Sequence, residues 1–404
     1  MMKKIIEPSI LLLIALVGFP QISETIYTPS LPDLAHYFGI GNALVNLTLS
    51  IYFVGFALGV LLWGRLADKF GRRPAMLWGI AIYIIGCIFC YFSSTISVLV
   101  FARFIQALGA SAGSVVTQTI MRDIYSGQRR SQVFSIISGA IAFSPALGPF
   151  IGGYIAEIWG FQTNFLALLI MGIWLFCSTF NSLPETKQGN AVFVNMFELS
   201  KKMVADKSIW AFSFLIAACN GIIFSYYGEA PFLFTEILGF SSSQYGMFGL
   251  TVALPILFAS ILSHRLNKHL DSESVIKIGA LTLLGGVFLL VAVGNLISAE
   301  HGLLGVISLV VPMMIVFTGV GIMIPNCISL ALQAYQTVLG SAGAFFGLMY
   351  YLMIGAMTEL MGVFHNGSIW PMALYFLVLA FMMHGVCTMR KPSVLCRGAQ
   401  QKNI

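Results

Sequence analysis

Apolar stretches of about 20 residues recur from one end of this chain to the other, and each is long enough to cross a lipid bilayer as a helix. Helices satisfy their own backbone polar groups inside a membrane, and the runs lack the strict alternation of a lipid-facing β-barrel. Because 58% of the 404 residues are hydrophobic, a soluble fold has too little interior to hide them. The sequence therefore predicts an all-α membrane protein with twelve transmembrane helices, at 9–30, 42–63, 75–93, 97–120, 132–155, 163–183, 208–234, 242–263, 275–297, 302–326, 341–363 and 369–389.

The basic residues test this count, because lysine and arginine gather in the cytoplasmic loops of membrane proteins. They precede the first span and follow every even-numbered span, whereas the six opposite loops contain neither residue. Both termini are therefore predicted to be cytoplasmic. No soluble basic domain remains to bind nucleic acid, so the net charge of +6 reflects topology. The basic groups lie at 3–4, 65–73, 122–130, 187–207, 265–277 and 390–402.

The longest polar stretch divides the chain into two sets of six spans. We expect an N-terminal six-helix bundle at 1–183, a cytoplasmic linker at 184–207, and a C-terminal six-helix bundle with a short cytoplasmic tail at 208–404. Within the linker, "VFVNMFELSKKMV" is apolar enough for an amphipathic helix on the membrane surface, and a solvated linker is the alternative. Two six-span halves are typical of secondary transporters, which bind their substrate between the halves.

The loop after the second span reads "GRLADKFGRRP". It resembles the signature loop of the major facilitator superfamily, and the matching residues are Gly64, Leu66, Ala67, Asp68, Gly71, Arg72 and Arg73. The resemblance implies a cluster that latches the two halves together on the cytoplasmic side when the substrate site faces outward, with Arg122 as the partner of Asp68. The alternative is a basic loop that serves topology alone.

Arg103, in the fourth span, is the basic residue that lies far from the cytoplasmic loops. A charge inside a membrane is costly and is by default a functional hypothesis. Arg103 with Gln106 resembles the family's arginine and glutamine in this helix, and family members use the arginine in proton coupling. The alternative is that its side chain reaches the outer membrane surface.

The fifth span contains "SPALGPFIGGY". Pro145, Gly148, Pro149, Gly152 and Gly153 resemble the motif typical of the superfamily's antiporters. Proline bends a helix by removing a hydrogen bond, and glycine lets neighbouring helices approach, so this helix is predicted to bend between the halves. The alternative is a generic close-packed helix. The motif is the main reason for predicting export rather than uptake.

The end of the first span, with Tyr27, Pro29, Leu31 and Pro32, resembles the bicyclomycin/chloramphenicol-resistance branch of drug:proton antiporters. Members of that branch carry an aspartate two residues before the tyrosine. Here that position is Thr25, and the carboxylate is one residue earlier, at Glu24. A carboxyl group held away from water can bind and release a proton near neutral pH, so Glu24 is the first candidate proton carrier. The alternative places it at the outer membrane surface.

Other polar residues inside the spans complete the candidate site. Glu229 is the second candidate for proton coupling, beside Glu24 and Arg103, and Glu359 is the third intramembrane carboxylate. For Tyr226 and Tyr227, the alternative to substrate binding is a place in the aromatic belt at the membrane surface. The candidates for substrate binding are Tyr27, Gln106, Asn220, Tyr226, Tyr227 and Asn326.

These patterns predict a proton-coupled exporter of amphipathic organic compounds, of the multidrug-efflux and drug-resistance type, that works by alternating access in the inner membrane of a bacterium. We expect a monomer that uses protons and a small-molecule substrate, without enzyme activity, cofactor or metal. The alternatives are an exporter of an endogenous metabolite such as a siderophore, a proton-coupled uptake symporter, and a membrane receptor or scaffold. Charges inside the spans argue against the last, because they are costly without a task.

Overall fold

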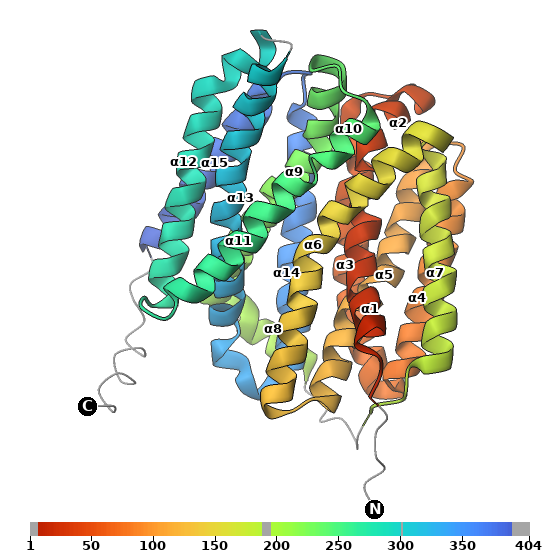
Figure 1. The fold of residues 1–404 in the computed structure, drawn as a ribbon. Coiled ribbons are helices and arrows are strands. Elements are labelled where there is room, and N and C mark those ends of the chain that lie inside the picture. Colours follow the sequence, from red (N-terminus) through yellow and green to blue (C-terminus); the bar gives the residue numbers. More distant parts are fainter. Residues whose placement is uncertain (1–6, 188–194, 300–301, 390–404) are drawn as a thin grey trace, which may run out of the picture.

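The computed structural model describes residues 7–187, 195–299 and 302–389, and within these ranges it is an all-helical bundle (Figure 1). The long helices lie side by side, and short ones cap the two ends. The helices of the first half are α1 (Ile10–Thr25), η1 (Thr28–Ser30), α2 (Leu31–Phe38), α3 (Asn42–Phe70), α4 (Arg72–Tyr91), α5 (Ile96–Ile124), α6 (Gly127–Trp159) and α7 (Gln162–Ser182). Those that follow are α8 (Met196–Ala205), α9 (Lys207–Phe232), η2 (Leu233–Ile237), α10 (Ser242–Met247), α11 (Leu250–Leu266), α12 (Ser272–Ala299), α13 (Leu303–Ala331), η3 (Gln333–Val338), α14 (Leu339–Phe364) and α15 (Trp370–Met389).

Each of the twelve predicted spans falls on a long helical segment. Eleven segments within the described ranges are long and apolar enough to cross a membrane. The remaining predicted span, 132–155, falls on α6, whose 33 residues give a length of about 50 Å at 1.5 Å per residue. The prediction of an all-α membrane protein is therefore confirmed.

The second helix is longer than predicted. It continues past residue 63 to Phe70, so most of "GRLADKFGRRP" is helix and only Gly71 separates α3 from α4. Gly71 has φ of 110°, a backbone conformation that favours glycine because it has no Cβ. The basic cluster is thus held on two helix ends, which fixes its side chains more firmly than a loop does.

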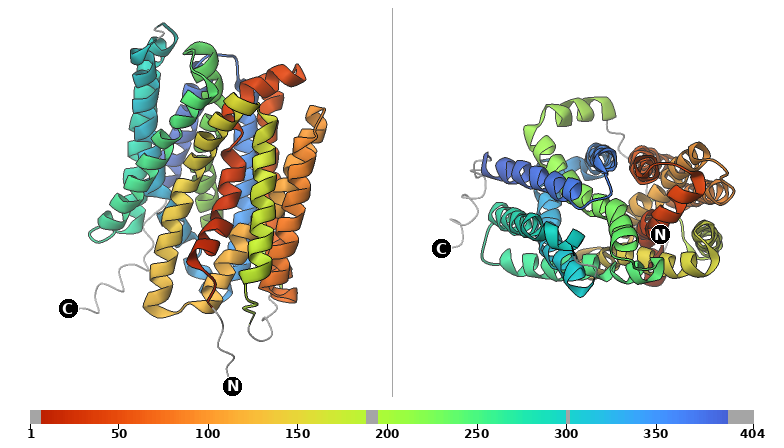
Figure 2. Two further views of the ribbon diagram at one scale, coloured as in Figure 1. Left: turned by 45° about the vertical axis from the view of Figure 1, so that its right-hand side comes forward. Right: turned by 90° about the horizontal axis from the view of Figure 1, so that it is seen from above.

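The buried apolar side chains form two main clusters, one on each side of the bundle. One contains residues between Leu12 and Leu183, together with Phe232 of α9. The other contains residues between Leu199 and Cys387, together with Phe53 of α3. Seen from above, helices α1–α7 and α9–α15 form two groups beside each other (Figure 2). We call these groups the N-half and the C-half.

The segment between the halves includes a short helix, α8. Its Leu199 and Met203 are buried against the C-half core, whereas Phe197 is 77% exposed. The predicted amphipathic stretch starts at residue 192, and its first three residues lie outside the described ranges. The described part of this stretch therefore forms a helix with one face on the protein.

The two halves are held together most closely at one end of the bundle. We call this the outer end, which carries α2 and α10, and we call the end that carries α8 the inner end (Figure 1). A Cβ added to Gly362, Gly355 or Gly347 of α14 would lie 2.7, 3.0 or 3.4 Å from the nearest atom of α3. This series runs from the outer end inward, so α14 packs on α3 along this stretch and most tightly at its outer end.

Hydrogen bonds from α10 to the N-half also lie at the outer end. The Ser242 hydroxyl donates to the Pro29 carbonyl at 3.2 Å, and the Ser243 backbone N–H donates to the Glu157 carboxylate at 2.9 Å. The described lysines and arginines of the loops lie at the inner end, which is therefore the cytoplasmic end by the distribution of positive charge.

Candidate functional site

Arg103 lies inside the N-half with none of its surface exposed. Its guanidinium group is sandwiched between the rings of Tyr27 and Tyr52, at 4.3 and 4.4 Å from their centroids. It donates hydrogen bonds to the Ser23 carbonyl at 3.1 Å and to the Gln106 side-chain oxygen at 2.5 Å. A planar, delocalised cation suits this position, because it stacks on two aromatic faces and bonds along its edge.

This burial decides between the two readings of Arg103. A side chain that reached the membrane surface would be exposed, and Arg103 is not. Among the described residues Arg103 forms no ion pair, and its Nη2 has no hydrogen-bond partner. An unpartnered nitrogen on a buried cation is costly, so this charge is held inside the bundle ready to act on a neighbouring anion.

Glu24 is a carboxylate that interacts electrostatically with Arg103. It lies near the end of α1, is only 6% exposed, and is within electrostatic range of Arg103. It is also within electrostatic range of Tyr227 on α9 and Tyr351 on α14, which belong to the C-half. Glu24 is therefore buried where the two halves meet.

Thr25 takes a different role from its neighbour. Its hydroxyl donates to the Pro145 carbonyl of α6 at 3.1 Å. That carbonyl is free because Pro149, four residues later, has no N–H to donate to it. The Tyr227 hydroxyl also donates to the Pro145 carbonyl, at 3.5 Å. The paired prolines thus expose one acceptor that links α1, α6 and α9 across the halves.

The glycines of the same helix allow α6 to approach its neighbours. A Cβ added to Gly148 would lie 2.0 Å from the Thr25 hydroxyl, and one added to Gly152 would lie 1.6 Å from the Ile26 carbonyl oxygen. A Cβ added to Gly153 would lie 2.4 Å from the Ser242 carbonyl oxygen of α10. Gly148 and Gly152 therefore face α1, whereas Gly153 faces the C-half.

Aromatic side chains fill the contact between the halves near Glu24. The Phe53 ring of α3 is 4.5 Å from that of Phe224 on α9, measured between centroids. The Phe56 ring is 4.7 Å from that of Tyr351 on α14. Sequence reasoning missed these residues, because nothing in an apolar span shows which of its aromatic side chains faces the other half.

Glu229 lies at the outer end of the bundle and is 1% exposed. One carboxylate oxygen accepts a hydrogen bond from the Asn46 amide at 3.1 Å. The other contacts His365 Nδ1 at 2.5 Å, and His365 Nε2 contacts the Asn42 amide at 2.7 Å. We call Asn42, Asn46, Glu229 and His365 the outer cluster. It joins α3 of the N-half to the C-half, at a place separate from Glu24.

Ser50 continues the same line of polar contacts along α3. Its hydroxyl donates to the Glu359 carboxylate of α14 at 2.5 Å. Asn42, Asn46 and Ser50 are four residues apart, so they lie on one face of the helix. This periodicity in "NALVNLTLS" was the signal that sequence reasoning could have used to find the outer contact.

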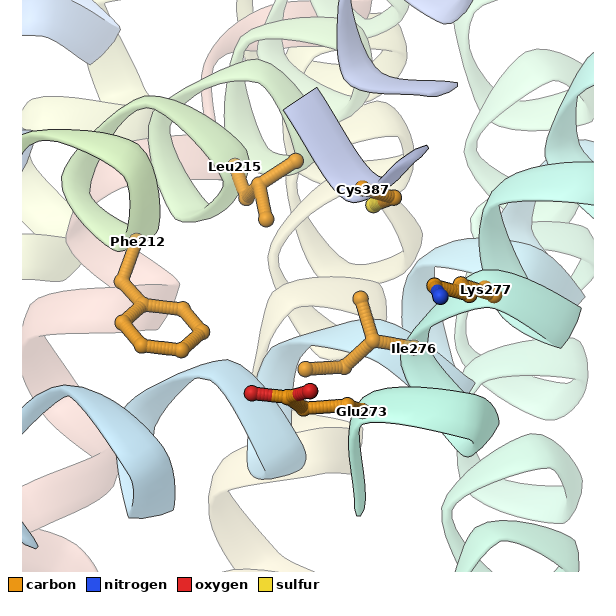
Figure 3. A pocket seen from close by; sticks show the side chains of 6 residues that line it. All are labelled: Phe212, Leu215, Glu273, Ile276, Lys277 and Cys387. Atoms are coloured by element: carbon orange, nitrogen blue, oxygen red, sulfur yellow. The ribbon is translucent and has the colours of Figure 1, made fainter. Parts of the chain in front are cut away.

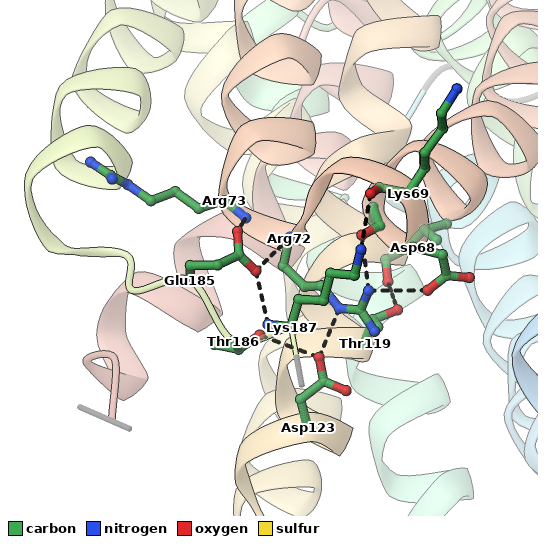
Figure 4. Close-up of polar contacts among 11 residues, drawn as sticks. Asp68, Lys69, Arg72, Arg73, Thr119, Asp123, Glu185, Thr186 and Lys187 are labelled. Carbon is green, nitrogen blue, oxygen red and sulfur yellow. Dashed lines mark hydrogen bonds and ion pairs between the residues drawn. The ribbon is translucent and has the colours of Figure 1, made fainter. Parts of the chain in front are cut away.

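Polar residues at the inner end surround Arg72 (Figure 4). Arg72 Nη1 is 3.1 Å from the Asp68 carboxylate, and Arg72 Nε is 2.8 Å from the Asp123 carboxylate. We call Asp68, Arg72 and Asp123 the inner cluster. In the structure Asp68 pairs with Arg72, and Asp123 of α5, the residue after Arg122, pairs with Arg72 as well.

The carboxylate of Glu185 supports this cluster from the end of the N-half. It accepts hydrogen bonds from the backbone N–H groups of Arg72 and Arg73, at 2.9 and 3.1 Å. A carboxylate at a helix N-terminus is favourable because it satisfies free N–H groups and complements the helix dipole. Gly64, another residue of the predicted latch, lies on α3 beside Val115 of α5. A Cβ added to Gly64 would lie 3.7 Å from the Val115 side chain.

Several predicted substrate-binding residues lie inside one half. Gln106 donates to the Cys87 sulfur at 3.1 Å and supports Arg103. Asn326 donates to the Ser263 hydroxyl at 2.7 Å, between α13 and α11 of the C-half. These amides are occupied by neighbours in the same half, which places them away from the contact between the halves.

The remaining candidates differ in position. The Tyr226 ring packs on Phe317 of the C-half, with centroids 5.3 Å apart, and Asn220 bonds to the Ile216 carbonyl of its own helix at 2.9 Å. Tyr227 contacts the N-half through the Pro145 carbonyl. The structure therefore brings together Glu24, Tyr27, Arg103 and Tyr227, and it separates them from Glu229 and Asn326.

A small pocket also lies near the inner end of the C-half (Figure 3). It is lined by side chains of α9, α12 and α15, among them Glu273 and Lys277. It lies within one half, away from Glu24 and Arg103, and it does not fit a site that must be reached from both sides of the membrane.

Two halves of membrane-spanning helices, with an arginine and a carboxylate buried near their contact, define a secondary transporter. Residues 13–358 match the Major Facilitator Superfamily, and the chain belongs to that family. It is a multi-pass membrane protein that transports a small molecule and is not an enzyme.

The relatives agree with this class. An uncharacterised transporter of Rickettsia bellii (strain RML369-C) is 37% identical over 380 residues, which cover 91% of this chain and 93% of that protein. A chloramphenicol resistance protein of Pseudomonas aeruginosa is 28% identical over 362 residues, covering 89% and 85%. The crystal structure of a D-xylose-proton symporter has the same fold, with a TM-score of 0.73 at 16% identity, and covers 93% of this chain and 96% of that one.

Proposed function

We propose that this protein is a proton-coupled exporter of amphipathic organic compounds, of the bicyclomycin/chloramphenicol-resistance type, in the inner membrane of a bacterium. The observation that supports it best is the fully buried Arg103 with Glu24 in its electrostatic range. A carboxyl group so placed has two states, one with a proton and one that is attracted to a cation. Proton and substrate then compete for one electrostatic environment, which couples their movements in opposite directions.

Transport proceeds by alternating access, with residues 1–183 and 208–404 moving as two bodies joined by the linker 184–207. The contacts between the halves at the outer end are formed in this structure, which fits the inward-facing part of the proposed cycle. The outer contact is largely polar. Its groups exchange protein partners for water when it opens, which costs less free energy than exposing an apolar surface.

The proline and glycine motif of α6 provides a pivot for this movement. The free carbonyl of Pro145 holds Thr25 and Tyr227 together, while Gly148 and Gly152 allow α6 to move closely along α1. Gain or loss of a proton at Glu24 can therefore affect the contact between α6 and α9, because the adjacent Thr25 is bonded to the same Pro145 carbonyl as Tyr227.

The inner cluster gives a testable distinction between two aspartates. The Asp68 side chain is 48% exposed and that of Asp123 is 21% exposed, while Arg72 is 11% exposed. An exposed ion pair contributes about 0–1 kcal/mol. We therefore expect Asp68→Asn to slow turnover with little change in substrate affinity or thermal stability, and Asp123→Asn to lower the thermal unfolding temperature.

Turnover is measured by efflux of ethidium from cells, and stability by thermal unfolding of the detergent-solubilised protein. Glu198→Asn, on the exposed face of α8, is the matched control and should change neither quantity. Normal turnover in Asp68→Asn would mean that the basic segment serves topology alone.

The chloramphenicol resistance protein among the relatives, at 28% identity, supports an organic substrate. The aromatic contact around Phe53, Phe224 and Tyr351 fits a ligand with an apolar body, and Glu24 fits a positive charge on it. Neutral and cationic amphipathic compounds are therefore the proposed substrate class.

The direction of transport is tested in everted membrane vesicles, whose lumen corresponds to the outside of the cell. When respiration acidifies the lumen, we expect ethidium to accumulate there, and we expect an uncoupler to release it. Vesicles without the protein are the control. Proton-driven loss of ethidium from preloaded vesicles would instead indicate an uptake symporter, and would contradict the proposed function.

A further inference from the structure

The outer cluster contains a histidine and a glutamate whose side chains are buried although they lie at the end of the bundle. The side chains of His365 and Glu229 are 7% and 2% exposed. His365 directly follows α14, and the next residue, Asn366, is exposed. The imidazole is therefore packed between the halves, one residue from the water on the outer side.

The members of the cluster come from three parts of the fold. Asn42 and Asn46 lie on the first two turns of α3, Glu229 lies near the end of α9, and His365 begins the connection to α15. Gly228 and Gly362 make room for Asn46, since a Cβ on either would lie within 2.8 Å of it. Opening the outer end has to separate the two asparagines from Glu229 and His365.

The charges around the cluster leave Glu229 dependent on histidine for a counter-charge. No lysine or arginine occurs in the six outer loops. Of the elements packed near Glu229, α2 carries Asp33 and His36, η2 carries Glu236, and α14 carries Glu359, which is bonded to Ser50. His365 is the titratable group in direct contact with the Glu229 carboxylate.

We propose that His365 and Glu229 form a proton-binding site on the outer side, and that uptake of a proton by His365 closes the contact between the halves. The proton adds to the ring nitrogen that is unprotonated in the neutral imidazole. Both ring nitrogens then donate, Nδ1 to the Glu229 carboxylate and Nε2 to the side-chain oxygen of Asn42, whose amide can present either atom. This inference rests on the proposed alternating-access transport.

The sign of the pH dependence follows from the environment of His365 in the closed state. Burial alone would lower the pKa of His365, but the hydrogen bond to Glu229 and its negative charge outweigh burial and raise the pKa above the usual value. Closure therefore takes up a proton. The stabilisation of the closed contact is fully present below the pKa of His365 in the open state, and it is lost as the pH rises through the raised pKa.

Glu157 is another carboxylate that joins the halves at the outer end, and it titrates in a different pH range from His365. Hydrogen bonds from Ser243 and Ser241 hold the pKa of Glu157 below its usual value. It therefore stays ionised above about pH 5, and its contribution to closure is constant over the range in which His365 changes its charge.

The experiment measures the width of the outer end in full-length protein reconstituted into lipid nanodiscs. Phe92 directly follows α4 and Leu303 begins α13, on opposite halves, and the two residues are 72% and 76% exposed. Spin labels are placed on Phe92→Cys and Leu303→Cys after replacement of the native cysteines, and their separation is measured by pulsed electron paramagnetic resonance between about pH 5 and about pH 9.

We expect the short separation to predominate at low pH, and the ratio of open to closed protein to rise at least about tenfold, ~1.4 kcal/mol, as the pH increases. His365→Gln and Glu229→Gln should each remove this dependence, whereas His36→Gln, at an exposed position on α2, should preserve it. A separation independent of pH in the unsubstituted chain, opening at low pH, or an unchanged dependence in His365→Gln would overturn the proposal.

This readout is independent of transport. Failure of the proposed function would appear as absent proton-driven accumulation of ethidium in everted vesicles, while the separation of the labels could still follow pH. Failure of the His365 proposal would leave that accumulation intact. If His365→Gln does not fold, the pH dependence of the unsubstituted chain and its loss in Glu229→Gln still decide the question.

Discussion

Glu24→Gln should abolish proton-driven export while leaving substrate binding in place. Glutamine has nearly the same shape as glutamate but carries no titratable proton, so the substituted protein keeps its packing between the halves and loses one of its two charge states. We expect the rate of gradient-driven ethidium transport in everted vesicles to fall by at least about tenfold, which corresponds to ~1.4 kcal/mol. Binding of ethidium to the purified protein should change much less.

The matched control for this substitution is Glu198→Gln, on the exposed face of α8. It removes the same charge from a position far from the contact between the halves, and it should transport normally. Unchanged gradient-driven transport in Glu24→Gln would exclude Glu24 as the proton carrier and would leave Glu229 and Glu359 as the remaining candidates.

Arg103→Lys should also abolish transport, although it conserves the charge. The guanidinium group lies between two tyrosine rings and bonds to Ser23, Gln106 and the Thr48 carbonyl. An ammonium group can neither stack in this way nor reach these acceptors together. Desolvated cation–π contacts contribute about 2 kcal/mol and hydrogen bonds to a charged group about 1.5–3 kcal/mol, so we expect a fall in transport rate of about a hundredfold or more.

Arg65→Lys, at an exposed position of α3, is the control for this substitution and should behave normally. Thermal unfolding of both proteins separates a loss of transport from a loss of fold. Transport at the original rate in Arg103→Lys would show that a positive charge alone suffices, and that the stacked geometry has no function.

The sequence was informative wherever a property belongs to a whole span. Length, apolar composition and the distribution of lysine and arginine predicted the helices, because a membrane imposes these features on every spanning segment. Arg103 was predicted from one residue, since a charge is so costly in a membrane that its presence implies a role.

The sequence was less informative about which way a side chain faces. Glu24 and Thr25 differ by about 100° around the helix. In the structure the Glu24 carboxylate interacts electrostatically with Arg103, and the Thr25 hydroxyl donates a hydrogen bond to the Pro145 carbonyl. A pattern inherited from relatives with an aspartate at position 25 does not predict this division of roles, because it depends on the freed carbonyl of a neighbouring helix.

The grouping of the polar residues was also beyond the sequence. Glu229 was predicted to act in proton coupling with Glu24 and Arg103, yet its partners are Asn46 and His365. Residues close in sequence on α9 face different neighbours, and the partners are brought in by α3 and α14. Such contacts depend on how the two halves meet, which a single sequence does not encode in any local pattern.

The contacts of the inner cluster, which lie within the N-half, were also only partly predictable from the sequence. Asp68 and Arg72 are four residues apart across the α3–α4 junction, so they pair locally. The contact from α5 comes from Asp123. The orientation of α5, which a local sequence pattern does not encode, brings the Asp123 carboxylate to Arg72.

The central claim is that a carboxyl group inside the bundle, in the electrostatic range of Arg103, gains and loses a proton. Infrared difference spectroscopy of the purified protein between about pH 5 and about pH 9 tests it most directly, because a protonated carboxyl group has its own band and no substrate is needed. We predict a band that disappears as the pH rises, is absent from Glu24→Gln and is retained in Glu198→Gln. Identical spectra for Glu24→Gln and the unsubstituted protein would contradict the claim.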